Sequence, residues 1–151
     1  QIVRGWVANL ATDPFANDTA LLEAIAAGQC DVGIVNTYYF GRIVKDKPDF
    51  PVRPFWANQA AGGTHVNISG AGVTRHSRNA AAATRFLEWL SSGEAQAHFA
   101  AVNMEYPVNP AAAVDPLVAS WGKFERSPLN VAEAGRLQPA AVRLMDRAGY
   151  R

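Results

Sequence analysis

A short apolar run between two helical patterns constrains the fold of this chain more than any other feature. The run Val32-Gly-Ile-Val35 is continuously apolar, so residues 31–36 predict a strand that is covered on both faces, as in a parallel sheet. Before it, Asn17 offers an N-cap oxygen and Gly28 suits the position after a helix end. After it, a short helix is expected over residues 38–45. This helix–strand–helix order is typical of α/β proteins.

The middle of the chain predicts two more helices and a second strand. Residues 78–90 carry an apolar face at helical spacing in an alanine-rich background. Ser91 and Glu94 have the spacing of a capping box, which predicts a further helix that ends near Val102. Residues 65–69 alternate weakly between apolar and polar side chains, which favours a strand.

Both ends of the chain are expected to be helical. Ile2, Trp6 and Leu10 recur at every fourth position, so they would share one helix face. A chain that begins inside a helix is interpreted as a fragment or a processed product. Two short helices are expected at the other end, the first capped by Asn130 and the second with Pro139 at its first position.

Composition and motifs exclude several classes of function. The chain has 151 residues, enough for one domain or two small lobes, and 14 basic residues against 13 acidic ones. A net charge of +1 argues against electrostatic binding of nucleic acid. No apolar run approaches the ~20 residues of a membrane helix, so no membrane insertion of this chain is expected. No phosphate loop, nucleophile elbow, Cys-x-x-Cys pair or metal-ligand spacing of histidines supports catalysis, and the chain is not expected to be an enzyme.

Tyr38 and Tyr39 stand side by side at the end of the predicted strand, and Arg42 follows three residues after the pair. Adjacent aromatic residues in such a place are commonly packing residues. Neighbouring side chains converge on one point only at a turn or a helix start, however, and strand ends are where open α/β sheets bind ligands. Aromatic packing and a ligand site are therefore both open interpretations.

The chemistry of these residues suits a highly charged metal ion. A phenol is neutral at pH 7, but a bound trication strongly favours the phenolate, which is a hard oxygen ligand suited to Fe(III). Arg42 cannot be a ligand because its guanidinium keeps its proton. It can balance negative charge or hold an anion through forked hydrogen bonds; the alternative is an exposed helix cation.

The segment from Asp31 to Arg42 resembles the double-tyrosine segment of periplasmic ferric-iron-binding proteins, which are the substrate-binding components of Fe(III) ABC importers. The similarity runs from end to end of the chain. Further matching stretches are Gly5-Trp-Val-Ala-Asn-Leu-Ala11, Gly63-Thr-His-Val-Asn-Ile-Ser-Gly-Ala-Gly-Val73, Glu105-Tyr-Pro-Val-Asn-Pro110 and Leu144-Met-Asp-Arg-Ala-Gly-Tyr150.

This resemblance implies the type II periplasmic-binding-protein fold, in which two α/β lobes joined by a hinge bind ligand in the cleft between them. The chain is expected to be a C-terminal fragment of that two-lobe structure. Residues 1–63 would belong to the second lobe, residues 64–114 would cross the hinge into the first lobe, and residues 115–151 would return as helices to the second. The family's other iron ligands, a His or Tyr and a further Tyr or acidic residue, would lie upstream.

The resemblance also implies a function. The chain would capture Fe(III) in the periplasm through Tyr38 and Tyr39, with Arg42 balancing charge or binding a synergistic anion such as carbonate. It would deliver the iron to an ABC permease in the inner membrane, and self-association of the fragment is a further expectation. The rival functions are binding of an anion or small organic solute, with the tyrosines stacking on it, and a ligand-sensing domain of a regulator.

Cys30 is the only cysteine in the sequence. Its residue type alone leaves two interpretations, a small buried hydrophobe or half of a disulfide with an upstream partner. Relatives in the family can carry a second cysteine on an upstream strand of the same lobe, and the periplasm is oxidising, so the resemblance makes a disulfide plausible.

Overall fold

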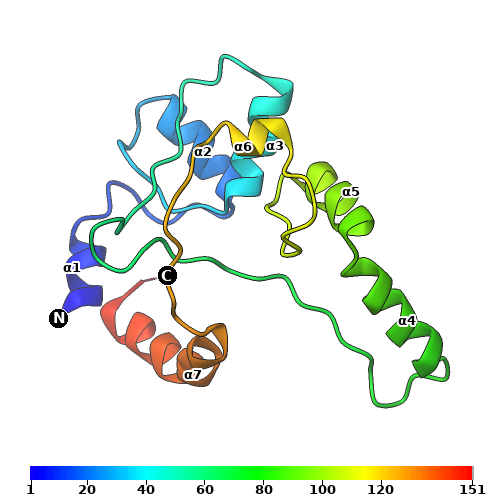
Figure 1. Cartoon of the computed structure of the whole chain (residues 1–151). Helices are drawn as coiled ribbons and strands as arrows, with labels where there is room; N and C mark the ends of the chain where they lie inside the picture. Colours follow the sequence, from blue (N-terminus) through cyan, green and yellow to red (C-terminus); the bar gives the residue numbers. More distant parts are fainter. Residues whose placement is uncertain (151) are drawn as a thin grey trace. The chain divides into compact units, whose positions relative to one another are not determined.

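The computed structural model describes residues 1–150, which contain seven helices (Figure 1). None of these helices is both long and apolar enough to cross a membrane. Within the same residues the backbone forms no strand, and a single parallel bridge joins Thr64 to Arg126. The helices are α1 (Ile2–Ala8), α2 (Asp18–Ala26), α3 (Thr37–Asp46), α4 (Ala80–Leu90), α5 (Gly93–Asn103), α6 (Pro116–Ala119) and α7 (Val131–Ala148).

Local capping signals account for the helix on each side of the apolar run. Asn17 is extended and its side chain accepts a hydrogen bond from the amide of Ala20, which begins α2 as predicted. Gly28 adopts a φ of +75° just after the C-cap of α2, a conformation that only glycine reaches without strain. The helix predicted over residues 38–45 is confirmed as α3.

The strands predicted over residues 31–36 and 65–69 are wrong for this chain, because neither segment forms a ladder within residues 1–150. A strand needs a neighbouring strand to accept its backbone hydrogen bonds. Gly33 lies against the side chains of α2, but Val32 and Ile34 are 85% and 98% exposed. The apolar run therefore lacks the cover on both faces that its composition predicts.

The start of α5 also differs from expectation. Ser92, not Ser91, caps α5, because Ser92 has the extended backbone of an N-cap (φ −67°, ψ 158°) and accepts from the amide of Ala95. The hydroxyl of Ser91 instead donates to the carbonyl of Leu87 in α4.

The C-terminal region forms one helix rather than two. Asn130 caps α7 as predicted, but Pro139 lies inside the helix and does not start a new one. A proline within a helix removes one backbone donor and crowds the carbonyl four residues earlier. That earlier residue is Gly135, the most conformationally permissive residue type, so α7 can accommodate the ring.

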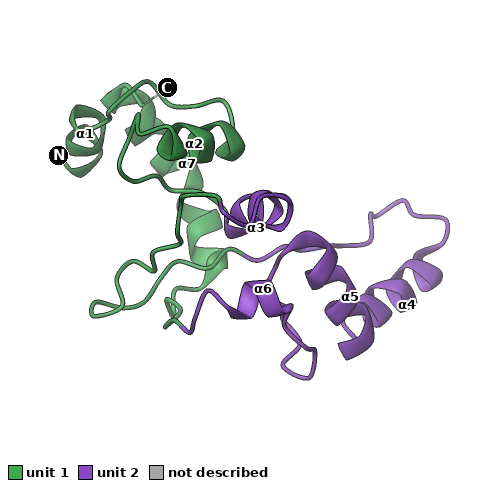
Figure 2. Ribbon diagram, turned by 90° about the horizontal axis from the view of Figure 1, so that it is seen from above, with its two compact units in different colours: residues 1–36, 50–67, 124–151 green, residues 37–49, 68–123 purple. Residues whose placement is uncertain are grey.

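The chain divides into two compact units, coloured separately in Figure 2. Unit 1 comprises residues 1–36, 50–67 and the chain from residue 124 onward, and unit 2 comprises residues 37–49 and 68–123. In unit 1, α1 packs against α7, and the rings of Trp56 and Phe124 stack with centroids 4.2 Å apart.

Gln59 joins two chain segments of unit 1 that lie far apart in the sequence. Its amide nitrogen donates to Thr64 Oγ1 at 3.0 Å and to the Glu125 carbonyl at 3.1 Å, while its oxygen accepts from the Glu125 amide at 2.8 Å. The backbone of Thr64 bonds to the same second segment: its amide donates to the Glu125 carbonyl, and its carbonyl accepts from the Ser127 amide. Gly63 makes this approach possible, since a Cβ there would lie 2.6 Å from the Arg126 backbone.

Most of the buried hydrophobic residues belong to unit 2. The half-buried Trp121 packs among aromatic residues of this unit: its ring lies 5.6 Å from that of Phe40 and 6.3 Å from that of Tyr106, centroid to centroid. The Tyr106 hydroxyl donates to the Val118 carbonyl at 3.3 Å, and burial raises the pKa of this tyrosine. The buried hydrophobic residues of unit 2 are Phe40, Ala95, Ala100, Met104 and Val118.

Gly41 allows α3 to pack closely on its neighbours in unit 2. A Cβ at this position would lie 2.6 Å from Met104 Cβ and 3.0 Å from the Trp121 ring. Glycine inside a helix is normally destabilising relative to alanine. Here the missing side chain is what allows the contact, and this contact fixes α3 in the unit.

Substitution Gly41→Ala should lower the free energy of unfolding by about 1–3 kcal/mol, because the added methyl group overlaps a backbone-anchored Cβ. The matched control is Gly5→Ala, since nothing lies within 4 Å of the Cβ it would add to α1. That control should leave stability unchanged or raise it by about 0.5–1 kcal/mol. Denaturant unfolding followed by circular dichroism measures both, and equal stability of the two variants would contradict the packing.

Candidate metal centre

The first turn of α3 brings Tyr38 and Tyr39 together. Their ring centroids lie 4.4 Å apart with an angle of 42° between the ring planes. Both side chains are partly exposed, whereas the next residue, Phe40, is buried in unit 2. The helix start thus anchors one aromatic residue in the core and leaves the preceding two accessible, which is a geometry that a ligand can use.

Arg42 lies one helical turn after the tyrosine pair, on the same side of α3. Its guanidinium carbon is 5.4 Å from the centroid of the Tyr38 ring and 5.8 Å from that of Tyr39, both within cation–π distance. Its Nη2 also donates to Oδ1 of Asn103 at 3.4 Å. The structure therefore groups all three residues singled out in the sequence, and Arg42 is more than an isolated helix cation.

Asp18 fixes the residue that precedes α3, and the sequence reasoning missed this role. Its Oδ2 accepts from the backbone amide of Asn36 at 2.7 Å and from the Asn36 side-chain amide at 3.1 Å. Asp18 directly follows Asn17 and also carries an oxygen acceptor, but only Asn17 caps α2. The carboxylate of Asp18 instead holds the chain just before the tyrosine pair.

Conventional metal ligands do not supplement the tyrosines within residues 1–150. No group of three or more His, Cys, Asp or Glu side chains in that range is arranged to hold a metal ion. Cys30 forms no disulfide among the described residues, so the predicted upstream partner stays a prediction. At this position the described residues offer two phenol oxygens as ligands, which do not complete the coordination shell of an octahedral ion, and one guanidinium that can only balance charge or bind an anion.

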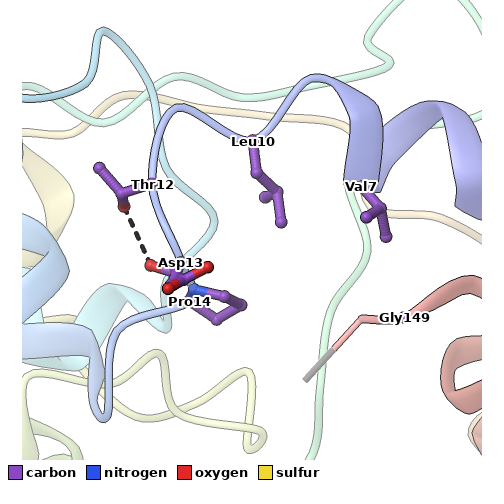
Figure 3. A pocket seen from close by; sticks show the side chains of 6 residues that line it. All are labelled: Val7, Leu10, Thr12, Asp13, Pro14 and Gly149. Carbon is purple, nitrogen blue, oxygen red and sulfur yellow. Dashed lines mark hydrogen bonds between the residues drawn. The ribbon is translucent and has the colours of Figure 1, made fainter.

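A separate hollow lies in unit 1, between α1, the loop that follows it and the end of α7 (Figure 3). Its volume is about 740 Å³ and it is open to solvent. The hydroxyl of Thr12 donates to the carbonyl of Asp13 at 2.9 Å, so one of the two polar side chains is already engaged. Its side-chain polar groups are one hydroxyl and one carboxylate, and the lining residues are Val7, Leu10, Thr12, Asp13, Pro14 and Gly149.

Curated relatives of the chain carry names that refer to iron. Iron uptake protein A2 of Synechocystis is 46% identical over 98% of this chain and 45% of its own length. The major ferric iron-binding protein of Neisseria meningitidis serogroup B is 28% identical over 91% of this chain and 42% of its own length. The chain thus spans about half the length of the curated relatives it matches.

Solved structures of similar proteins match the fold closely. Trichodesmium IdiA (FutA), solved with iron and citrate ligands, has a TM-score of 0.92 at 41% identity and covers 98% of this chain and 49% of its own. Apo FutA2 from Synechocystis has a TM-score of 0.91 at 44% identity, over 99% of this chain and 50% of its own. The expected fold, part of the type II periplasmic-binding-protein structure, is confirmed by these matches.

The sequence also matches a protein family as a whole, in agreement with its similarity to individual relatives. The family described as bacterial extracellular solute-binding protein matches residues 1–126, which is most of the sequence. The matched range includes the tyrosine pair, Arg42 and Asn103. This chain belongs to the family of bacterial extracellular solute-binding proteins.

Proposed function

We propose that this chain is part of an extracytoplasmic protein that captures Fe(III) and delivers it to an ABC importer. The observation that carries the proposal is the pairing of Tyr38 and Tyr39 at a helix start, with Arg42 over both rings. Relatives named for iron uptake and ferric-iron binding support the choice of metal. Capture and release require no bond making in a substrate, so the proposed role is not catalytic.

In this proposal Tyr38 and Tyr39 bind Fe(III) as phenolates. The trication favours loss of the phenol protons, and hard phenolate oxygen matches a hard metal ion. Arg42 offsets the accumulated negative charge, or holds a synergistic anion such as carbonate beside the metal through its forked N–H groups. The partial exposure of both tyrosine rings supports direct access of the ion.

The remaining ligands are proposed to come from outside this sequence. Two phenolates cannot fill the shell of an octahedral ion, and the described residues hold no cluster of His, Cys or carboxylate ligands. We infer a two-lobe protein in which residues 1–63 and 115–151 belong to the second lobe and residues 64–114 reach the first. Closure of the lobes would then bury the iron.

The partners follow from the family. Its members are described as extracellular solute-binding proteins, which supports a periplasmic location and docking to a permease in the inner membrane. Self-association of this chain belongs to the same proposal. The high exposure of Val32 and Ile34, 85% and 98%, supports it, because apolar surface of this kind favours contact with another chain.

Removing the phenol oxygens tests the metal site directly. Titration of the chain with ferric citrate should produce a visible tyrosinate-to-iron charge-transfer band. The band should weaken in Tyr38→Phe and in Tyr39→Phe and vanish in the double variant, because phenylalanine keeps the ring but offers no ligand. Tyr150→Phe, which alters a tyrosine outside α3, is the matched control and should keep the full band.

The same titration separates iron binding from its main rival. If the tyrosines only stack on an anion or organic solute, the phenylalanine variants keep the ring and ligand binding survives. A charge-transfer band that persists in the double variant sinks the proposed role of the pair.

The need for upstream ligands predicts weak binding by this chain alone. Loss of a single supporting residue at a metal site typically costs 10–100-fold in affinity. The chain should therefore bind ferric citrate-derived iron at least about a hundredfold more weakly than iron uptake protein A2 of Synechocystis, assayed side by side by competition with a chelator. Comparable affinities would show that the tyrosine pair needs no further ligands.

A further inference from the structure

The close packing at Gly41 has a consequence for the residue that follows it. Because Gly41 lies against Met104, the neighbouring residues Arg42 and Asn103 are brought beside each other. Arg42 lies in the middle of α3, and Asn103 is the last residue of α5. The contact joins positions 61 residues apart in the sequence, both within unit 2.

The side-chain amide of Asn103 is oriented by a second hydrogen bond. Its Nδ2 donates to the carbonyl of Phe99, one turn earlier in α5, at 2.9 Å. This leaves Oδ1 to accept from Arg42 Nη2 at 3.4 Å. The opposite orientation of the amide would place a donor against the guanidinium and an acceptor against a carbonyl, so only this one satisfies both partners.

Met104 holds the end of α5 in a conformation that is uncommon for its residue type. Its φ of 58° lies in the left-handed region, and its side chain is 2% exposed. Non-glycine residues persist in this region only when surrounding packing determines them, and such positions concentrate at functional sites. Here the buried side chain of Met104 fixes the last turn of α5 and with it the place of Asn103.

We propose that Asn103 is a positioning residue for the metal centre: it holds the Arg42 guanidinium over both tyrosine rings and so presents its remaining N–H groups to an anion bound beside the phenolates. A guanidinium has five N–H donors, and the contact with Asn103 engages only one side of it. An exposed arginine otherwise samples many rotamers. The inference rests on the proposed iron function, because the anion it serves is a co-ligand of the metal.

The position of Arg42 can be measured without any metal. In the intact 151-residue chain the NMR signals of the Arg42 side chain should be displaced upfield by ring currents from the two tyrosines. Asn103→Ala should reduce this displacement by at least half. Asn103→Asp keeps the acceptor, although it loses the bond to Phe99, and should retain the displacement.

A matched control excludes a general effect of changing an asparagine. Asn79 lies in the same unit before α4, and its side chain makes no capping hydrogen bond. Asn79→Ala should therefore leave the Arg42 signals unchanged. An unchanged displacement in Asn103→Ala overturns the inference. So does an equal loss in Asn103→Asp with native backbone amide signals, since that result assigns the role to the Phe99 bond.

The bicarbonate dependence of the charge-transfer band tests whether Asn103 contributes to anion binding. With ferric ion and bicarbonate as probes, Asn103→Ala should need roughly tenfold more bicarbonate than the parent chain for half of the charge-transfer band, a tenfold change being about 1.4 kcal/mol. Identical bicarbonate dependence in the two proteins overturns the inference. A band that persists when Tyr38 and Tyr39 are both phenylalanine, with the Arg42 displacement still sensitive to Asn103, instead overturns the proposed iron site.

Discussion

The close approach of Gly41 to Met104 is the contact on which the candidate site depends. The absent Cβ lets α3 lie against the end of α5 and the Trp121 ring, and this packing buries Phe40 while the two preceding tyrosines stay accessible. It also aligns Arg42 with Asn103. Non-polar packing thus determines where the polar groups of the site can meet.

Local signals in the sequence predict the helices well, because the physics that forms them acts over a few residues. Asn17, Gly28 and Asn130 cap helices where their residue types indicate. Pro139 was misread because a proline suits a first helical turn in general, and only the structure places it within one continuous helix. The strand over residues 31–36 was misread for a different reason: it depends on neighbouring strands that residues 1–150 do not provide.

The same distinction applies to the candidate site. Tyr38, Tyr39 and Arg42 fall within one turn of a helix, so their meeting is predictable from spacing alone. Asp18 reaches Asn36 across 18 residues, and Asn103 reaches Arg42 across 61. Helical or strand periodicity in a sequence does not predict contacts between residues so far apart in the chain. Sequence reasoning therefore finds the groups proposed to bind iron and misses the residues that hold them in position.

The central claim is that the tyrosine pair of α3 supplies phenolate ligands to Fe(III). Resonance Raman spectroscopy of the coloured ferric complex, excited in the charge-transfer band, tests it most directly. Tyrosinate ring modes should be enhanced, should shift in protein made with ring-deuterated tyrosine, and should be absent when Tyr38 and Tyr39 are both phenylalanine. A coloured complex whose enhanced modes do not respond to tyrosine labelling would contradict the account.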